Sequence, residues 1–242
     1  MKKLRLTVLV SFVLMPVWSQ SETNKNLHSD GGGWGLKNVQ PEGEKSVLLI
    51  GNSICNGYKE YVAKELPGYR VIAWVNPYHL KSEHFYSDLV KVLKSEKWDV
   101  VHFNIGLHGW EKGRIPEGQY QPLLQNLVDT LKQYAPDSKL IWASITPITN
   151  KEKPYITNQE LNPIIADRNL IAGIVMKNNG IPVNDLYSLC LLNMHLARGD
   201  RFHWTAPMYR MMGIQTAEKI KIIFAVNNDF SIEKGDVQKV KE

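Results

Sequence analysis

From residue 46 onward, short runs of apolar residues alternate with longer segments in which apolar residues recur every three or four positions. The first pattern predicts buried strands and the second predicts amphipathic helices. The predicted strands are residues 46–50, 69–75, 100–104, 140–143 and 181–184. The predicted helices are residues 54–66, a segment capped by Ser82 that carries Phe85 and Leu89, and residues 119–134, 158–178 and 206–224.

Strands that are apolar throughout and alternate with helices indicate a parallel sheet covered on both faces. The pattern therefore predicts an α/β fold, a three-layer α/β/α sandwich around a mostly parallel, five-stranded central sheet. In such sheets, ligands bind outside the carboxyl ends of the strands. Residues 51–53 follow the first predicted strand and residues 104–108 follow the third. Both segments are expected at that edge.

The two ends of the chain differ from this periodic region, which we assign to one domain over residues 45–226. Residues 1–20 combine a basic start, an apolar run and small polar residues, the pattern of a secretory signal peptide. We therefore expect an exported protein, periplasmic or secreted. Residues 21–44 are polar and Gly-rich and are predicted to be a flexible lead-in, and residues 227–242 a polar C-terminal tail. No later apolar run approaches the ~20 residues of a membrane-spanning helix.

Charge and cysteine content narrow the function classes. Loss of Lys2, Lys3 and Arg5 with the signal peptide would lower the formal net charge from +5 to +2. The remaining lysines are scattered, so no nucleic-acid partner is expected. Cys55 and Cys190 could form a disulfide in an oxidising compartment or remain two buried thiols. No Cys/His spacing indicates a metal site.

Two short segments carry candidate chemistry. Gly51-Asn52-Ser53 places a hydroxyl on the turn after a buried strand, and Asp200 and His203 stand three residues apart near the other end of the chain. A serine needs a neighbouring imidazole to accept its proton, and the imidazole needs a partner that fixes its tautomer. The order Ser, Asp, His is therefore typical of a serine hydrolase.

These segments resemble the SGNH hydrolases, also called GDSL esterases/lipases, and specifically an exported bacterial branch. Residues 47–58 (VLLIGNSICNGY) resemble the family's first block and residues 101–110 (VHFNIGLHGW) its third block, here with Gly-Leu-His. Residues 140–147 and 181–186 are similar to strands of that branch, and Asp200 to His203 resembles the last block, Asp-x-x-His. The resemblance implies a flavodoxin-like fold over most of residues 45–225.

By this resemblance, Ser53 is the nucleophile, His203 the general base and Asp200 the group that orients it. The backbone N–H of Ser53, beside Gly51 and Asn52, is implied as an oxyanion donor. His108 stands where the family has a donor asparagine. It is the first candidate for the side-chain donor, and Asn104 is the second. Gly106 and Trp110 complete the predicted substrate-binding set.

Three positions depart from the family pattern. Asn52 replaces the usual aspartate before the serine, and Gly109 stands where many members have aspartate. After the second strand the chain has Asn76-Pro77 where the family brings a glycine whose N–H completes the oxyanion hole. Because proline has no N–H, the second backbone donor is in question.

The expected activity is hydrolysis of O-acyl esters, most simply O-acetyl groups on a carbohydrate, without metal or cofactor. Trp34, Trp110 and Trp204 are candidates for walls against a sugar ring, with core packing as the alternative for Trp110 and Trp204. A second hypothesis is a catalytically reduced carbohydrate-binding protein of the cell envelope with the same fold. The departure at Pro77 favours this alternative, and the presence of Ser53 together with Asp200 and His203 opposes it.

Overall fold

A computed structural model describes residues 34–111 and 113–238, with side chains up to residue 225. The predicted signal peptide and the first part of the lead-in therefore lie outside the described residues. The strands are β1 (Gly35–Gln40), β2 (Lys45–Gly51), β3 (Tyr69–Val75), β4 (Val100–Phe103), β5 (Lys139–Ala143) and β6 (Val183–Asn184). The α-helices are α1 (Ser53–Glu65), α2 (Phe85–Lys94), α3 (Tyr120–Tyr134), α4 (Asn162–Asn178), α5 (Leu186–Leu191) and α6 (Ala206–Gln238).

The strands form one sheet in the order β1-β3-β2-β4-β5-β6. Strands β2 to β6 are parallel, which confirms the predicted α/β sandwich. The predicted count of five strands was wrong, because β1 adds an antiparallel edge strand paired with β3. This strand falls inside the segment predicted to be a flexible lead-in. Its sequence, GLKNVQ, buries only Leu36, so it lacks the apolar run that identified the inner strands.

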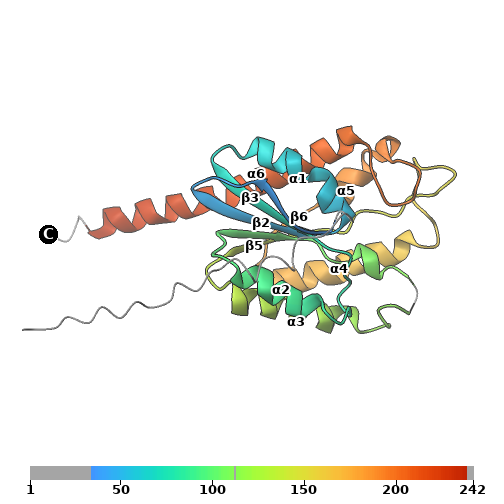
Figure 1. Ribbon diagram of the computed structural model, residues 1–242, viewed down its shortest axis with the longest axis horizontal. Helices are drawn as coiled ribbons and strands as arrows, with labels where there is room; N and C mark the ends of the chain where they lie inside the picture. The colour runs from blue at the N-terminus through green and yellow to red at the C-terminus, as the bar shows by residue number, and fades with distance from the viewer. Residues whose placement is uncertain (1–33, 112, 239–242) are drawn as a thin grey trace, which may run out of the picture.

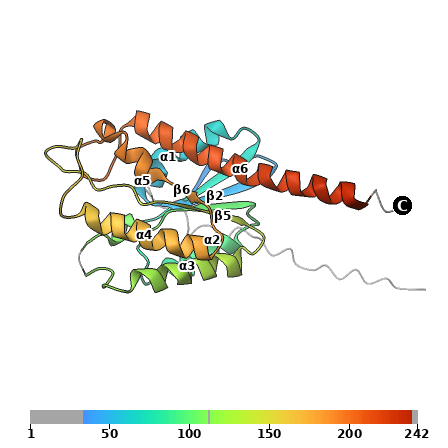
Figure 2. The ribbon, with the colours of Figure 1, turned by 180° about the vertical axis from the view of Figure 1, so that it is seen from behind.

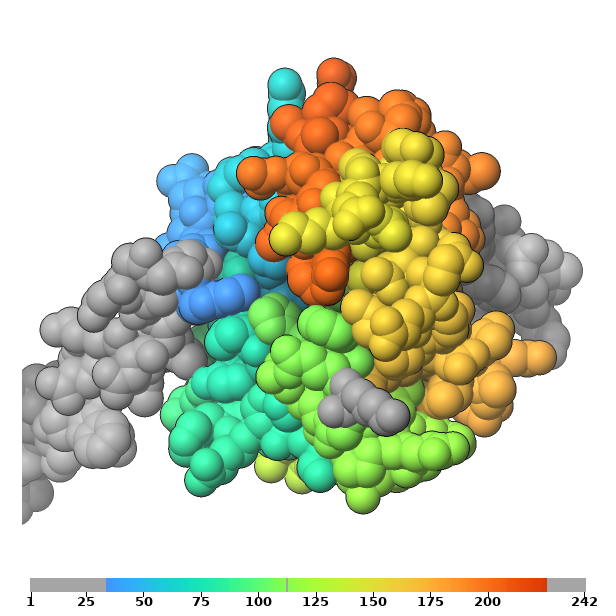
Figure 3. Space-filling model, turned by 90° about the vertical axis from the view of Figure 1, so that its right-hand side faces the viewer, coloured from blue at the N-terminus to red at the C-terminus, as the bar shows by residue number. Residues whose placement is uncertain are grey.

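Helices cover both faces of the sheet. Helices α1, α5 and α6 lie on one face, and α2, α3 and α4 lie on the other, in both views of the ribbon (Figures 1 and 2). The loops at the carboxyl ends of the strands form the face seen in Figure 3. Within the described part of the chain, no helix has the length and apolar character needed to cross a membrane.

The predicted helices differ from the observed ones mainly at their ends. Helix α4 begins at Asn162 rather than at residue 158, because the side chain of Asn158 accepts hydrogen bonds from the N–H groups of Glu160 and Leu161 in a turn before the helix. The short helix α5 was not predicted. Helix α6 continues through Gln238, over part of the segment predicted to be a polar tail, and extends beyond the sheet (Figure 1).

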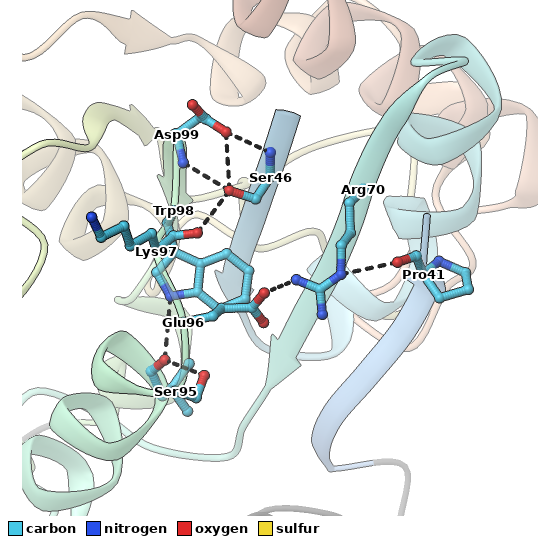
Figure 4. A network of polar contacts seen from close by, with 9 residues as sticks. Pro41, Ser46, Arg70, Ser95, Glu96, Lys97, Trp98 and Asp99 are labelled. Carbon is cyan, nitrogen blue, oxygen red and sulfur yellow. Dashed lines mark hydrogen bonds and ion pairs between the residues drawn. The ribbon is translucent and has the colours of Figure 1, made fainter. Parts of the chain in front are cut away.

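Polar contacts align β2 with β4 at the amino edge of the sheet, opposite the predicted site. The Asp99 carboxylate accepts from the N–H and hydroxyl of Ser46 at 2.7 and 3.1 Å, and the Ser46 hydroxyl also donates to the Lys97 carbonyl at 2.8 Å (Figure 4). Beside them, Arg70 pairs with Glu96. This clamp sets the register in which Ile50 lies opposite Phe103. The two strands consequently end level at the opposite edge.

The two cysteines are both buried and free. Cys55 lies on α1 and faces the core, where burial raises the pKa of its thiol to about 12. Burial also raises the pKa of Cys190, on α5. Of the two alternatives, the structure shows buried thiols rather than a bridge.

We expect Asp99→Ala to lower the free energy of unfolding by roughly 1–2 kcal/mol, because the N–H and hydroxyl of Ser46 lose their carboxylate partner. Since the clamp lies at the amino edge, any enzymatic rate constant of the folded protein should stay near that of the parent. Urea denaturation measures the first effect. Lys97→Ala is the control, because Lys97 contributes only its backbone carbonyl to the network. Equal stability of the Asp99 variant and the parent would contradict the role of the clamp.

Candidate active site

A small pocket opens where the loops at the carboxyl ends of the strands meet. Its volume is about 140 Å3, and it is lined by Ser53, Leu107, His108, Trp110, Phe202 and His203. In the space-filling view, segments from the blue start of the described chain, the green middle and the orange C-terminal part meet at the centre of this face (Figure 3). The fold therefore brings together side chains from segments about 50 and 150 residues apart.

Ser53 is the first residue of α1, directly after the turn that ends β2. The side chain of Asn52 accepts a hydrogen bond from the Ile54 N–H at 2.9 Å and caps the helix. Asparagine is as good an N-cap as aspartate, so its replacement of the usual aspartate preserves this turn. Gly51 is required by close packing, because a Cβ there would lie 2.5 Å from the Cβ of Cys55. The Ser53 N–H lies at a position with no partner inside the helix, at the positive end of the helix dipole.

The second segment folds around a single carboxylate. Asp200 accepts from the N–H groups of Phe202 and His203 through Oδ1, at 3.1 and 2.8 Å, and its Oδ2 lies 2.9 Å from Nδ1 of His203. Burial alone would raise the pKa of Asp200, but these hydrogen bonds favour the charged form more strongly and the net shift is downward. Asp200 thus remains a carboxylate in mildly acidic solution.

The structure brings Ser53, His203 and Asp200 into one chain of hydrogen bonds. Nε2 of His203 lies 2.9 Å from the hydroxyl oxygen of Ser53, across 150 residues of sequence. A carboxylate can only accept, so Nδ1–H of His203 donates to Asp200. Nε2 is then the free acceptor for the Ser53 proton. This is the arrangement of nucleophile, base and orienting group that acyl transfer requires.

The loop of Asp200 and His203 contains one strained residue. Arg201 has φ of +78°, in the left-handed region that side chains other than glycine rarely adopt. Its carbonyl accepts from the Thr149 N–H at 2.9 Å, and the His203 carbonyl accepts from the Arg198 N–H at 3.0 Å. These bonds hold the loop against its neighbours and thereby fix the direction of the imidazole.

Of the two predicted side-chain donors to the oxyanion, Asn104 and His108, only His108 lines the pocket. The Asn104 side chain is buried and donates to the carbonyls of Ala143 and Ser144 at 2.8 and 3.0 Å, so its amide joins the ends of β4 and β5 and does not line the pocket. His108 does line the pocket. Gly106, two residues before it, is packed so closely that a Cβ would lie 2.2 Å from Ile145.

His108 is suited to donate without carrying charge. Its pKa is lowered, first by burial and then by nearby positive groups, Arg114 foremost. The imidazole is consequently neutral at neutral pH and has one N–H to donate. At Gly109, next in the chain, a larger side chain has little room, since a Cβ there would lie 2.7 Å from the Ile115 side chain. This packing explains the absence of the aspartate found at the matching position of the motif that the segment resembles.

The turn after β3 uses its own backbone donors. The N–H of Asn76 donates to the Gly51 carbonyl, that of Tyr78 to the Asn76 side chain, and that of His79 to the Ser82 hydroxyl, at 2.8, 3.1 and 3.0 Å. Pro77 has none. The four residues at this turn therefore have no free backbone N–H for an oxyanion. The Ser53 N–H and the His108 side chain remain the candidates for that role.

Aromatic rings surround the pocket. Trp110 packs against Phe202 with ring centroids 5.6 Å apart, and both line the pocket. Trp34 contacts the His108 ring edge to face, with centroids 5.7 Å apart. Trp204 is 1 % exposed and belongs to the core, so of its two predicted roles the structure shows packing.

Leu107 and Phe202 also line the pocket, although neither was predicted from the sequence. Leu107 lies between Gly106 and His108, and Phe202 lies between Asp200 and His203. The signal in the sequence that could have found them is that each lies between two residues predicted to belong to the site. Among the described residues, no group of three His, Cys, Asp or Glu side chains is placed to hold a metal ion.

Comparisons with known proteins give the fold but no closer relationship. No protein-family model matches the chain, and no curated protein matches it. A carbohydrate acetylesterase from Sinorhizobium meliloti superposes with a TM-score of 0.61 at 13% identity, over 74% of this chain and 100% of that one. An acetylxylan esterase from Geobacillus stearothermophilus superposes with a TM-score of 0.58 at 15% identity, over 74% and 95%.

A candidate GDSL-like lipase from Parabacteroides merdae gives a TM-score of 0.60 at 15% identity, over 75% of this chain and 98% of that one. At such low identities the shared property is the fold. The chain therefore has the α/β fold of GDSL-type esterases and lipases, as the resemblance of its motifs implied.

We expect His108→Ala to lower kcat for an ester substrate by roughly a hundredfold or more with KM little changed, as for loss of one oxyanion donor. Steady-state kinetics and a melting curve measure this. A higher KM with normal kcat would instead indicate a contact with the substrate alcohol, and normal kinetics with a lower Tm a structural role. His79→Ala is the control, because this nearby imidazole does not line the pocket.

Proposed function

We propose that this protein is an exported serine esterase that hydrolyses O-acyl esters, specifically O-acetyl groups on a carbohydrate. The observation that carries the proposal is the chain of hydrogen bonds from Ser53 through His203 to Asp200, at 2.9 Å for each link between side chains. The chain lies at the mouth of a pocket, on a fold shared with esterases and lipases.

The proposed reaction is acyl transfer in two steps. Ser53 attacks the ester carbonyl while Nε2 of His203 takes the hydroxyl proton and passes it to the departing alcohol. Water, activated by the same imidazole, then attacks the acyl-enzyme, releasing the acid and restoring Ser53. The negative oxygen of each tetrahedral intermediate is stabilised by the Ser53 N–H and by the neutral His108.

Pocket size supports a short acyl group. A volume of about 140 Å3 is well below the ~300 Å3 at which drug-sized ligand pockets begin. The rings of Trp110 and Phe202 form an apolar wall that suits the face of a sugar. Acetyl-carbohydrate esterases are among the proteins of similar fold. Export is proposed from the signal-peptide pattern of residues 1–20.

A second candidate is a carbohydrate-binding protein of the cell envelope with reduced catalysis. The observation that favours it is the turn at Asn76 to His79, whose backbone donors are all occupied or absent. Such a protein would bind acetylated glycans and release acetate very slowly or not at all. Ester turnover therefore separates the two candidates.

We expect the purified protein to release acetate from at least one of a panel of acetylated glycans, and Ser53→Ala to abolish this release. Loss of a comparable serine nucleophile costs on the order of 10⁶ in kcat. The Ser53 hydroxyl bonds only to His203 among the described residues, so the variant should keep the parent's Tm. Near-parent turnover by Ser53→Ala would contradict its role as nucleophile, whereas tight glycan binding without turnover by the parent would favour the binding protein.

His203→Ala should reduce kcat more than Asp200→Ala, because the first removes the base and the second only its orientation. Steady-state kinetics with an ester substrate measures both variants against the parent. The lowered pKa of Asp200 keeps that carboxylate ionised in mildly acidic solution, so the parent imidazole retains its orienting partner there. Near-parent kcat in His203→Ala would argue against His203 as the base.

A further inference from the structure

Trp34 contacts the candidate oxyanion donor from outside the pocket. Its ring lies 5.7 Å from the His108 ring, centroid to centroid, with 77° between the planes. This is the edge-to-face geometry that aromatic pairs favour. Trp34 is half-buried and packs against the core, yet it is not among the residues that line the pocket. Any influence it has on the reacting atoms therefore passes through His108.

The antiparallel edge strand places Trp34 there. In the register of β1 with β3, Gly35 lies opposite Val75, the last residue of β3. Trp34 consequently extends past the carboxyl end of β3, beside the turn that begins at Asn76. The blue start of the described chain adjoins the green segment at the centre of the pocket face (Figure 3).

The His108 imidazole has few other restraints. The backbone carbonyl of His108 accepts from Arg114 at 3.0 Å, a bond that restrains the main chain and does not involve the ring. Over residues 34–111 and 113–225, no hydrogen bond to either imidazole nitrogen is found, and Trp34 provides its one aromatic contact. A donor to an oxyanion must be oriented before charge develops. The contact with the Trp34 ring is therefore the interaction that can orient the His108 imidazole.

We propose that Trp34 is a positioning residue that holds the His108 imidazole in the orientation from which it donates to the oxyanion. The inference rests on the proposed esterase function. The proposal gives β1 two roles. The strand forms the edge of the sheet, and it also places the Trp34 ring against the His108 imidazole. Because the turn after β3 supplies no backbone donor, the site depends on this orientation more than a site with a complete set of donors would.

The test is a double-mutant cycle with p-nitrophenyl acetate, which lacks a sugar. Trp34→Ala should lower kcat about five- to tenfold with KM little changed, as expected for loss of one aromatic contact. In the His108→Ala background the same change should have almost no further effect, since the donor it orients is absent. Trp34→Phe should restore most of the rate, because a phenyl ring can make the same contact.

A second readout does not need activity. Burial is the largest cause of the lowered pKa of His108, so uncovering the ring by Trp34→Ala should raise that pKa toward its ordinary value, measured by NMR titration. The charged and titratable groups that act on it stay the same in this variant: Arg114, His79 and His203, which lower the pKa, and Glu111, which raises it. Tyr69→Leu is the control, because it removes a similar aromatic contact with Phe224 at the other end of β3.

Four results would overturn the proposal. A higher KM with normal kcat would make Trp34 a substrate contact. A lower Tm with parent kinetics, as expected for the Tyr69 control, would make it edge packing. Equal losses of kcat with and without His108 would show that it acts independently. If the parent shows no ester turnover, the proposed function fails, and an unchanged pKa of His108 in Trp34→Ala would still refute the contact with the imidazole on which the positioning role rests.

Discussion

Parallel pairing of β2 with its neighbours β3 and β4 is the constraint on which the site depends. Parallel strands end at the same edge, so the pairing of Ile50 with both Trp74 and Phe103 brings three separate turns to one place. Ser53 follows the first strand, the Asn76 turn the second and the His108 turn the third. The Ser46–Asp99 clamp supports this register from the opposite edge, where its polar contacts do not disturb the pocket.

Electrostatics around the serine follow from how each turn uses its hydrogen-bond donors. At the start of α1, Asn52 accepts from Ile54 and the Ser53 N–H remains available. At the turn after β3, the backbone donors are used to stabilise the turn itself. His108 offers a donor that the turn after β3 lacks. Burial lowers the pKa of its imidazole, which is therefore neutral and can donate without introducing a competing charge.

The loop of Asp200 and His203 shows how a motif of four residues becomes a rigid unit. One carboxylate accepts two backbone N–H groups and the imidazole, and the left-handed Arg201 between them turns the chain sharply enough for this. Strain of this kind persists only when surrounding contacts enforce it. The bond from Thr149 to the Arg201 carbonyl provides such a contact, and it comes from the long loop after β5.

The sequence by itself determined the inner sheet, most of the helices and four of the six residues that line the pocket, Ser53, His108, Trp110 and His203. Inner strands such as residues 69–75 are buried on both faces, so most of their residues are apolar. This pattern can be recognised in the sequence without knowing which strands lie beside it. Tertiary structure alone decided the edge strand β1, because an edge strand buries one side and its polar sequence resembles a loop. Tertiary structure also decided that the Asn104 amide joins two strands and does not line the pocket, and that Trp34 contacts His108. Neither depends on local sequence, since each partner lies dozens of residues away and is chosen by the packing of the whole sheet.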